Sequence, residues 1–193
     1  MNARLEPDTR AASDVTRFRA IRGAMPALAE GLSPEDLAAQ SMPDCSPGKW
    51  HLAHTSWFFE AMILSADPDY APVDPRFQTL FNSYYEALGT RVERPERGLM
   101  TRPTLDEVLA YRREIDLRMA QWLGDGLTDP RRLYLFTLGL HHDQQHHAHV
   151  VYLAAGGACR GGMAQLVHRL DERKDDRHQQ QVVCREHAVG QVA

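Results

Sequence analysis

Apolar side chains recur at every third or fourth position along four long stretches of this chain, over about residues 13–28, 47–64, 104–122 and 130–155. This spacing places the apolar side chains on one face of an α-helix. None of these stretches shows the strict alternation of apolar and polar residues that is typical of a half-buried strand. A helix with one apolar face must bury that face against other helices, so the pattern predicts an all-α fold, a four-helix bundle.

Capping signals indicate where several of the predicted helices begin. Ser33 is followed by a proline and two acidic residues, which predicts the start of a short helix. Ser46 is also followed by a proline and predicts the start of the second long helix. Thr104 and Glu107 have the spacing of a capping box. A further helix is expected over residues 77–88.

The length of 193 residues and the hydrophobic fraction of 43% fit one globular domain with a sizeable core. The helical pattern spans residues 13–155, which we expect to form that domain. Residues 1–12 are polar, and we expect them to be disordered. Residues 156–193 are rich in glycine, glutamine and charged residues with only a weak apolar pattern, so we expect a weakly structured tail.

Charge and cysteine content argue against several classes of function. The chain has 22 Lys+Arg against 26 Asp+Glu, a net charge of -4, which disfavours binding to nucleic acid or to an anionic membrane through bulk charge. No apolar run approaches the roughly 20 residues that a membrane span requires, and the first residues contain no signal-peptide core. Three cysteines are too few and too scattered for a disulfide framework. We therefore expect a cytoplasmic protein.

Histidines are the most informative residues of the chain. His142 and His146 are four positions apart, so their side chains lie one above the other on the last long helix. Both continue the apolar stripe of that helix, and His54 lies in the apolar stripe of the second long helix. Burying an imidazole without a polar partner is costly. Either the three histidines are hydrogen-bonded core residues or they share one metal ion, and the residues alone leave both interpretations open.

A site of three histidines would leave coordination positions open, as catalysis requires. Three neutral imidazoles suit iron(II), zinc, nickel or cobalt, and the ligand type alone does not choose among these metals. Asp143 and Gln145 flank the histidine pair and are candidates for orienting the ligands. His51 lies about 60° around its helix from His54 and remains a reserve ligand. We expect the other histidines of the last helix to face solvent, namely His141, His147 and His149.

Around these residues the chain resembles a known family, the sulfoxide synthases of ergothioneine biosynthesis (the EgtB family). Three segments resemble the N-terminal domain of these enzymes: QSMPDCSPGKWHLAHTSWFFEAMIL (40–64), LFNSYYEALGTRVERPERGLMTRPTLDEVLAYRREID (80–116) and LGLHHDQQHH (138–147). The resemblance covers about residues 15–147. It implies a DinB-like four-helix bundle that holds one non-haem iron(II) ion, with the ligands at His54, His142 and His146.

The resemblance also implies an activity. Family members use O2 to join a cysteine-containing thiol to the imidazole ring of hercynine (trimethylhistidine) through a C–S bond, with oxidation to a sulfoxide. An Arg-x-x-Arg stretch, here Arg94 to Arg97, is implied to bind the carboxylates of the thiol, for which forked guanidinium groups are suited. The alternative for these arginines is a surface ion-pair cluster with Glu93 and Glu96.

Family enzymes continue into a second domain that resembles formylglycine-generating enzymes and supplies a catalytic tyrosine and most of the hercynine pocket. The 193 residues show no match to that domain, so we expect the bundle to bind metal but to need such a partner domain for turnover. Two alternatives remain open. The chain is a free-standing DinB-like protein that uses zinc or nickel in thiol transfer or hydrolysis, or it is a non-catalytic remnant.

Overall fold

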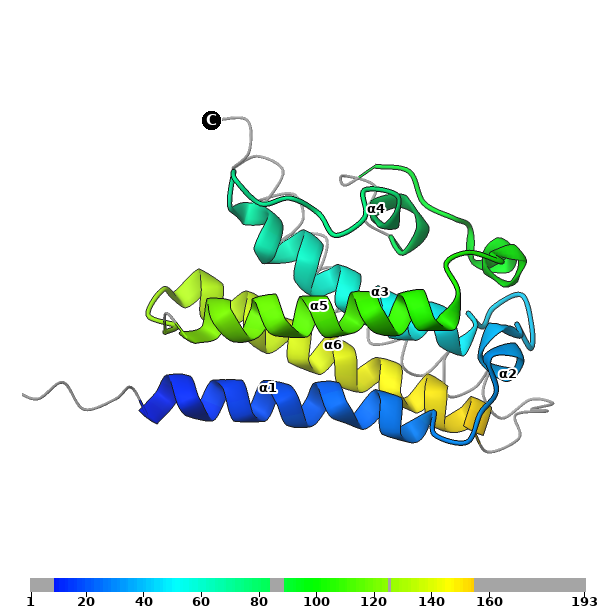
Figure 1. Cartoon of the computed structure of the whole chain (residues 1–193), viewed down its shortest axis with the longest axis horizontal. Helices are drawn as coiled ribbons and strands as arrows, with labels where there is room; N and C mark the ends of the chain where they lie inside the picture. The colour runs from blue at the N-terminus through cyan, green and yellow to red at the C-terminus, as the bar shows by residue number, and fades with distance from the viewer. Residues whose placement is uncertain (1–8, 84–88, 125, 155–193) are drawn as a thin grey trace, which may run out of the picture.

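The computed structural model describes residues 9–83, 89–124 and 126–154, and within these ranges every regular element is a helix. α1 and α3 each pack against both α5 and α6, which confirms the predicted all-α bundle. Residues 156–193, the expected weakly structured tail, lie outside the described residues. Figure 1 shows the long helices of the bundle, which are α1 (Thr9–Leu28), α3 (Gly48–Met62), α5 (Leu105–Gly124) and α6 (Pro130–Ala154).

Shorter helices lie in the connections between the long ones. They are α2 (Pro34–Ala38), η1 (Leu64–Ala66), α4 (Phe77–Leu80) and η3 (Arg94–Leu99). The predicted capping box at Thr104 is present, and the predicted helix start at Ser33 also forms a capping box. Ser33 and Asp36 exchange side-chain hydrogen bonds with each other's backbone N–H groups at the start of α2, and Thr104 and Glu107 do the same before α5. Local sequence therefore sets these two helix starts.

The helix expected over residues 77–88 is much shorter than predicted, because α4 ends at Leu80. The backbone carbonyls of Leu80 and Phe81 accept hydrogen bonds from side chains of α3 instead. The indole N–H of Trp50 donates to Leu80 at 3.2 Å, and Nδ1 of His54 donates to Phe81 at 2.7 Å. Contacts with α3 thus replace the continuation of α4, while residues 84–88 lie outside the described residues.

The second long helix also starts differently from the prediction. Its N-cap is Pro47, and no side chain caps it. The hydroxyl of Ser46 accepts a hydrogen bond from Nη1 of Arg97 at 2.9 Å instead of capping the helix. A polar side chain that the local sequence assigns to a helix start is therefore used to hold η3 against α3.

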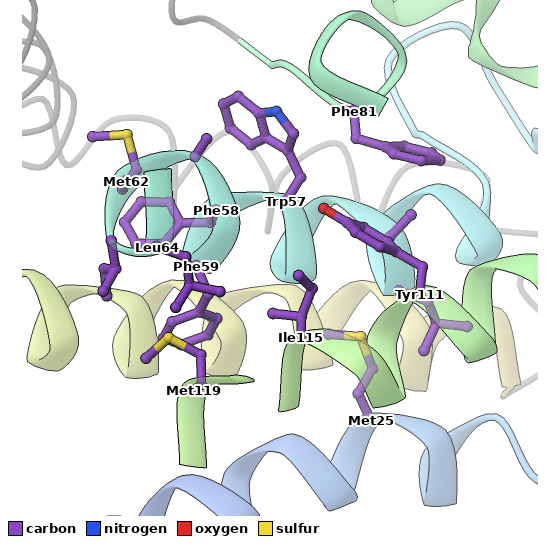
Figure 2. Close-up of a cluster of buried hydrophobic side chains, with 14 of the residues drawn as sticks. Met25, Trp57, Phe58, Phe59, Met62, Leu64, Phe81, Tyr111, Ile115 and Met119 are labelled. Carbon is purple, nitrogen blue, oxygen red and sulfur yellow. The ribbon is translucent and has the colours of Figure 1, made fainter. Parts of the chain in front are cut away.

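α3 is the central helix of the fold, since all of its residues are buried. Figure 2 shows Trp57, Phe58 and Phe59 of α3 within the apolar cluster that also contains Ile115 of α5 and Met25 of α1. A helix buried on all sides has no solvent face, so its polar residues must find partners inside the protein. No helix in the described ranges has the length and apolar character needed to cross a membrane.

Gly139 allows α6 to approach α3 closely just before the first histidine of the predicted pair. A Cβ atom at this position would lie 2.5 Å from the ring of Phe59 and 3.2 Å from that of Phe58. Real Cβ contacts are not this short, so a larger residue would force α6 away from α3. The glycine therefore helps to bring His142 of α6 next to α3.

A buried ion cluster joins the four long helices next to the histidines. Asp143 of α6 is fully buried and contacts Arg22 of α1 at 2.7 Å and Arg112 of α5 at 3.4 Å. Arg112 also donates to the hydroxyl of Thr55 on α3 at 2.7 Å, and Arg22 forms an ion pair with Asp116. Arg22 and Arg112 lie among the apolar residues of their helices. An apolar pattern predicts apolar side chains at such positions, so it does not reveal this cluster. The cluster thus ties Asp143 of α6 to α1 and α5.

Candidate metal centre

Three imidazoles converge between α3 and α6. One nitrogen atom from each of His54, His142 and His146 lies within 4.8 Å of the corresponding atoms of the other two. The Nε2 atoms of His54 and His142 are 3.1 Å apart, and the three ring centroids are separated by 4.6 to 4.9 Å. The structure thus brings together the three histidines that the helical stripes direct into the core.

The two helices place these rings in surroundings that differ in solvent access. His54 and His142 are buried, with exposed fractions of 2% and 5%, whereas His146 is half-buried. The ring of His54 stacks on Trp50 with a centroid distance of 4.3 Å, and the ring of His142 stacks on Phe58 at 4.6 Å. Flat aromatic neighbours therefore hold both buried imidazoles in fixed orientations.

The hydrogen bond to Phe81 sets the tautomer of His54. A carbonyl oxygen can only accept, so Nδ1 of His54 must carry the proton that it shares with Phe81. In the neutral ring, Nε2 then carries a lone pair, and this atom is the one that faces His142. Metal-binding histidines commonly donate their second N–H in this way. His54 therefore has the tautomer that a metal ligand requires.

His142 has one buried nitrogen atom without a hydrogen-bond partner, Nδ1. Its other nitrogen, Nε2, faces His54. Nε2 is therefore the nitrogen of His142 that could bind a metal ion together with Nε2 of His54.

Burial keeps these imidazoles neutral. It lowers the pKa of His142 to about 4 and, together with the neighbouring histidines, lowers the pKa of His54 and His146 well below the usual value. Neutral imidazole is the form that binds metals. The donor set contains three nitrogens, and the residues present fit a divalent metal ion of the iron(II), nickel or zinc type.

Two further histidines join the cluster in positions that the helical stripes do not reveal. His51, the reserve ligand, is buried on α3, and its Nδ1 lies 2.7 Å from Nδ1 of His146. The ring of His149, which was expected in solvent, stacks on His51 with a centroid distance of 4.6 Å and an interplanar angle of 5°. His141 is exposed, as expected. Single-helix periodicity cannot detect such contacts, because they form between two helices.

Of the two residues that flank the histidine pair, Asp143 contacts the buried arginines of other helices. Asp143 binds the two buried arginines and His147, whose Nε2 lies 2.8 Å from it. His147, which was expected to face solvent, therefore contacts Asp143, which lies four positions before it on the same helix. None of the hydrogen bonds shown for Asp143 reaches His142 or His146. Gln145, the other candidate for orienting the ligands, is exposed.

The predicted arginines lie in η3 on the other side of Trp50 from the histidines. The guanidinium carbon of Arg97 lies 3.8 Å from the centroid of the indole of Trp50, and Trp50 in turn stacks on His54. Arg97 is buried, with 3% of its surface exposed. Arg94 is half-buried and donates to the backbone carbonyl of Asp44 at 3.3 Å. A column of three flat groups thus connects η3 to the candidate metal centre.

Arg97 is a buried cation whose polar contacts are neutral. It donates to the hydroxyl of Ser46 and to the carbonyl of Val92, and no carboxylate pairs with it in the described part of the chain. Burial, followed by repulsion from Arg94, lowers its pKa to about 9. Glu93 attracts Arg97 electrostatically, but its direct ion pair is with Arg91 at 3.1 Å. A buried cation of this kind is suited to bind an anionic group.

Comparison with known proteins identifies a family for most of the chain. The family model of the DinB superfamily matches residues 17–150, a range that contains the three converging histidines and the arginines of η3. No curated protein matches the sequence.

Proposed function

The chain belongs to the DinB superfamily, and on this basis we propose that it is the iron(II)-binding domain of an ergothioneine-type sulfoxide synthase. His54, His142 and His146 are the proposed ligands. The observation that carries the metal site is the convergence of three neutral imidazoles, one of which is held in the ligand tautomer by Phe81. The resemblance of the segments around these residues to sulfoxide synthases supports the choice of reaction.

The proposed reaction joins a thiol and hercynine at the expense of one O2. The S–H bond of the thiol and a ring C–H bond of hercynine break, a C–S bond forms, and the sulfur is oxidised to a sulfoxide. One oxygen atom is found in the sulfoxide and the other in water with the two released hydrogens, which balances the four electrons that O2 accepts. When bound, iron(II) would supply the chemistry that reduces O2 at the open face of a three-histidine site.

Arg97 has the position expected of a group that anchors the thiol substrate. Its guanidinium can pair with a carboxylate of a peptide-like thiol such as γ-glutamylcysteine. Since Arg97 lies over Trp50 and Trp50 lies over His54, a carboxylate bound there would be separated from the ligand ring by one indole. Arg94, three positions earlier in the same helix, is the proposed second anchor.

Proton transfer to the reacting centre is assigned to a second domain of the formylglycine-generating type, as the resemblance implies. Tyr70 and Tyr111 of this bundle both donate to Glu60 rather than to the three histidines. We therefore expect the bundle to supply the metal and the thiol site, and a partner domain to supply the acid and the hercynine pocket.

Metal content tests the first part of the proposal. The full chain is loaded with iron(II) anaerobically, desalted and analysed by metal mass spectrometry beside His146→Ala and the control His141→Ala, whose histidine is exposed. We expect one iron per wild-type and control chain, and at least about 100-fold weaker binding by His146→Ala. Stoichiometric zinc or nickel after expression, with no stable iron, would favour the alternative of a free-standing DinB-like thiol transferase or hydrolase.

A turnover assay tests the second part. The iron-loaded chain is mixed with hercynine, γ-glutamylcysteine and O2, with and without a formylglycine-enzyme-like domain from the same source. We expect the sulfoxide product, detected by mass spectrometry, only when both polypeptides are present and only with intact ligands. Absence of product in every mixture, from a chain that binds iron, would reject the synthase while leaving the metal site in place.

A further inference from the structure

The proposed ligands differ in what contacts the Nδ1 atom of each ring. Nδ1 of His54 is bonded to the carbonyl of Phe81, and Nδ1 of His142 has no partner. Nδ1 of His146 lies 2.7 Å from Nδ1 of His51, which is a hydrogen-bond distance. His51 is therefore a side chain outside the ligand set whose polar atom reaches a ring nitrogen of a ligand.

His51 is itself held firmly. It is buried with 4% of its surface exposed, its ring stacks almost parallel on His149, and it meets the indole of Trp50 edge-on at 5.5 Å. A neutral imidazole has one lone pair with which it can accept a hydrogen bond.

We propose that His51 is a positioning residue for the metal centre: its Nδ1 accepts the Nδ1–H of His146 and leaves the Nε2 lone pair of His146 free for the metal. This inference rests on the proposed metal site. Two nitrogens 2.7 Å apart must include one donor and one acceptor, and a ligand ring gains a defined tautomer and orientation when it is the donor. His146 is also the half-buried member of the set, so its ring has most need of a side-chain partner.

The role explains the spacing of the two histidines on α3. Residues three positions apart on a helix point in directions that differ by about 60°, so His54 and His51 can reach different rings of the neighbouring helix. His54 faces the centre, and His51 faces the outer edge of His146 on the neighbouring helix. One helix thus provides a ligand and the partner of another ligand.

The test compares metal binding by His51→Phe and His51→Gln with that of the wild type. Phenylalanine keeps a flat ring between Trp50 and His149 but cannot accept a hydrogen bond, whereas the amide oxygen of glutamine can. His141→Gln serves as the control, because His141 is an exposed histidine on α6. Affinities for iron(II) and zinc(II) alone are measured by competition with a chromophoric chelator, and X-ray absorption counts the bound imidazoles.

We expect His51→Phe to bind metal about 10- to 100-fold more weakly, with much of the loss restored in His51→Gln and no loss in the control. The count of bound imidazoles should be the same in wild type and both variants. Unfolding of the metal-free proteins in urea provides a check on folding, and a folded His51→Gln variant keeps the test valid if phenylalanine is not tolerated.

Three results would overturn the inference in different ways. Equal affinities of wild type and His51→Phe would show that His51 does not position His146. A count of imidazoles that falls by one in both variants would show that His51 is a ligand itself. Failure of the wild type to bind either metal would instead reject the proposed metal site on which the inference rests.

Discussion

His54 donates its Nδ1 proton to the backbone carbonyl of Phe81 across 2.7 Å, and this contact acts on both partners. It sets the tautomer of a proposed metal ligand, and it uses a carbonyl that a longer α4 would have used for its own helical hydrogen bond. The early end of α4 and the orientation of His54 are therefore one structural feature. Four measurements test how such contacts support the site.

The stability of the metal-free protein should fall as the pH is lowered from about 6.5 toward 4. The folded state holds His54, His142 and His146 neutral, with the pKa of His142 at about 4, while the unfolded chain takes up protons below about pH 6.5. Each such histidine contributes a slope of up to about 1.4 kcal/mol per pH unit, with stability rising as the pH rises.

Urea unfolding at a series of pH values measures this slope. His142→Gln removes one of the groups and should give a shallower pH dependence than the wild type. The lowered pKa of Asp143 acts in the same direction, but only below about pH 4. A free energy of unfolding that stays constant between pH 6.5 and 4.5 would show that these rings take up protons in the folded state.

Replacing Arg97 by glutamine should weaken binding of a carboxylate-bearing thiol. Loss of a charge-assisted hydrogen bond costs about 1.5 to 3 kcal/mol, which corresponds to roughly a 10- to 100-fold change in Kd. Calorimetric titration of the metal-loaded chain with γ-glutamylcysteine measures the change. Arg113→Gln, which removes an exposed arginine of α5, is the matched control and should bind as the wild type does. Equal affinities for both variants would remove Arg97 from the substrate site.

Replacing Asp143 by asparagine should strongly destabilise the fold. The substitution leaves the buried guanidinium groups of Arg22 and Arg112 without their shared carboxylate, and removing one partner of a buried ion pair costs about 3 to 5 kcal/mol. Urea unfolding gives the free energy. His147→Gln removes only the half-buried partner of Asp143 and should cost much less. Similar small losses in both variants would mean that the arginines find other partners or water.

Replacing Gly139 by alanine should destabilise the bundle and weaken metal binding together. The new methyl group would overlap the ring of Phe59, at a cost of about 1 to 3 kcal/mol, and would move α6 away from α3. Gly23→Ala is the control, because a Cβ there meets no atom within 4 Å and alanine favours the helix by up to about 1 kcal/mol. Thermal unfolding and metal titration measure both effects. An unchanged metal affinity in Gly139→Ala would show that the site tolerates this displacement.

Several site residues were predictable and others were not, for a reason that depends on where their partners lie. His54, His142 and His146 follow from the phase of the apolar stripes, because the side chains on the buried face of a helix repeat with its turn. His51 does not, since it contacts a histidine 95 positions away on another helix. The phase of the apolar stripes does not predict the burial of Arg22 either, because its charge is neutralised by carboxylates on two other helices.

Local patterns were sufficient for the helical class of the fold, the capping box at Thr104, the helix start at Ser33 and the inward direction of three histidines. These features depend on residues within one or two helical turns of each other. The tautomer of His54, the use of Ser46 by Arg97 and the stacking of Arg97 on Trp50 depend on segments that are 27 to 51 positions apart. Such partners are selected by how the helices pack against one another, and this packing minimises the free energy of the whole bundle rather than that of any one segment.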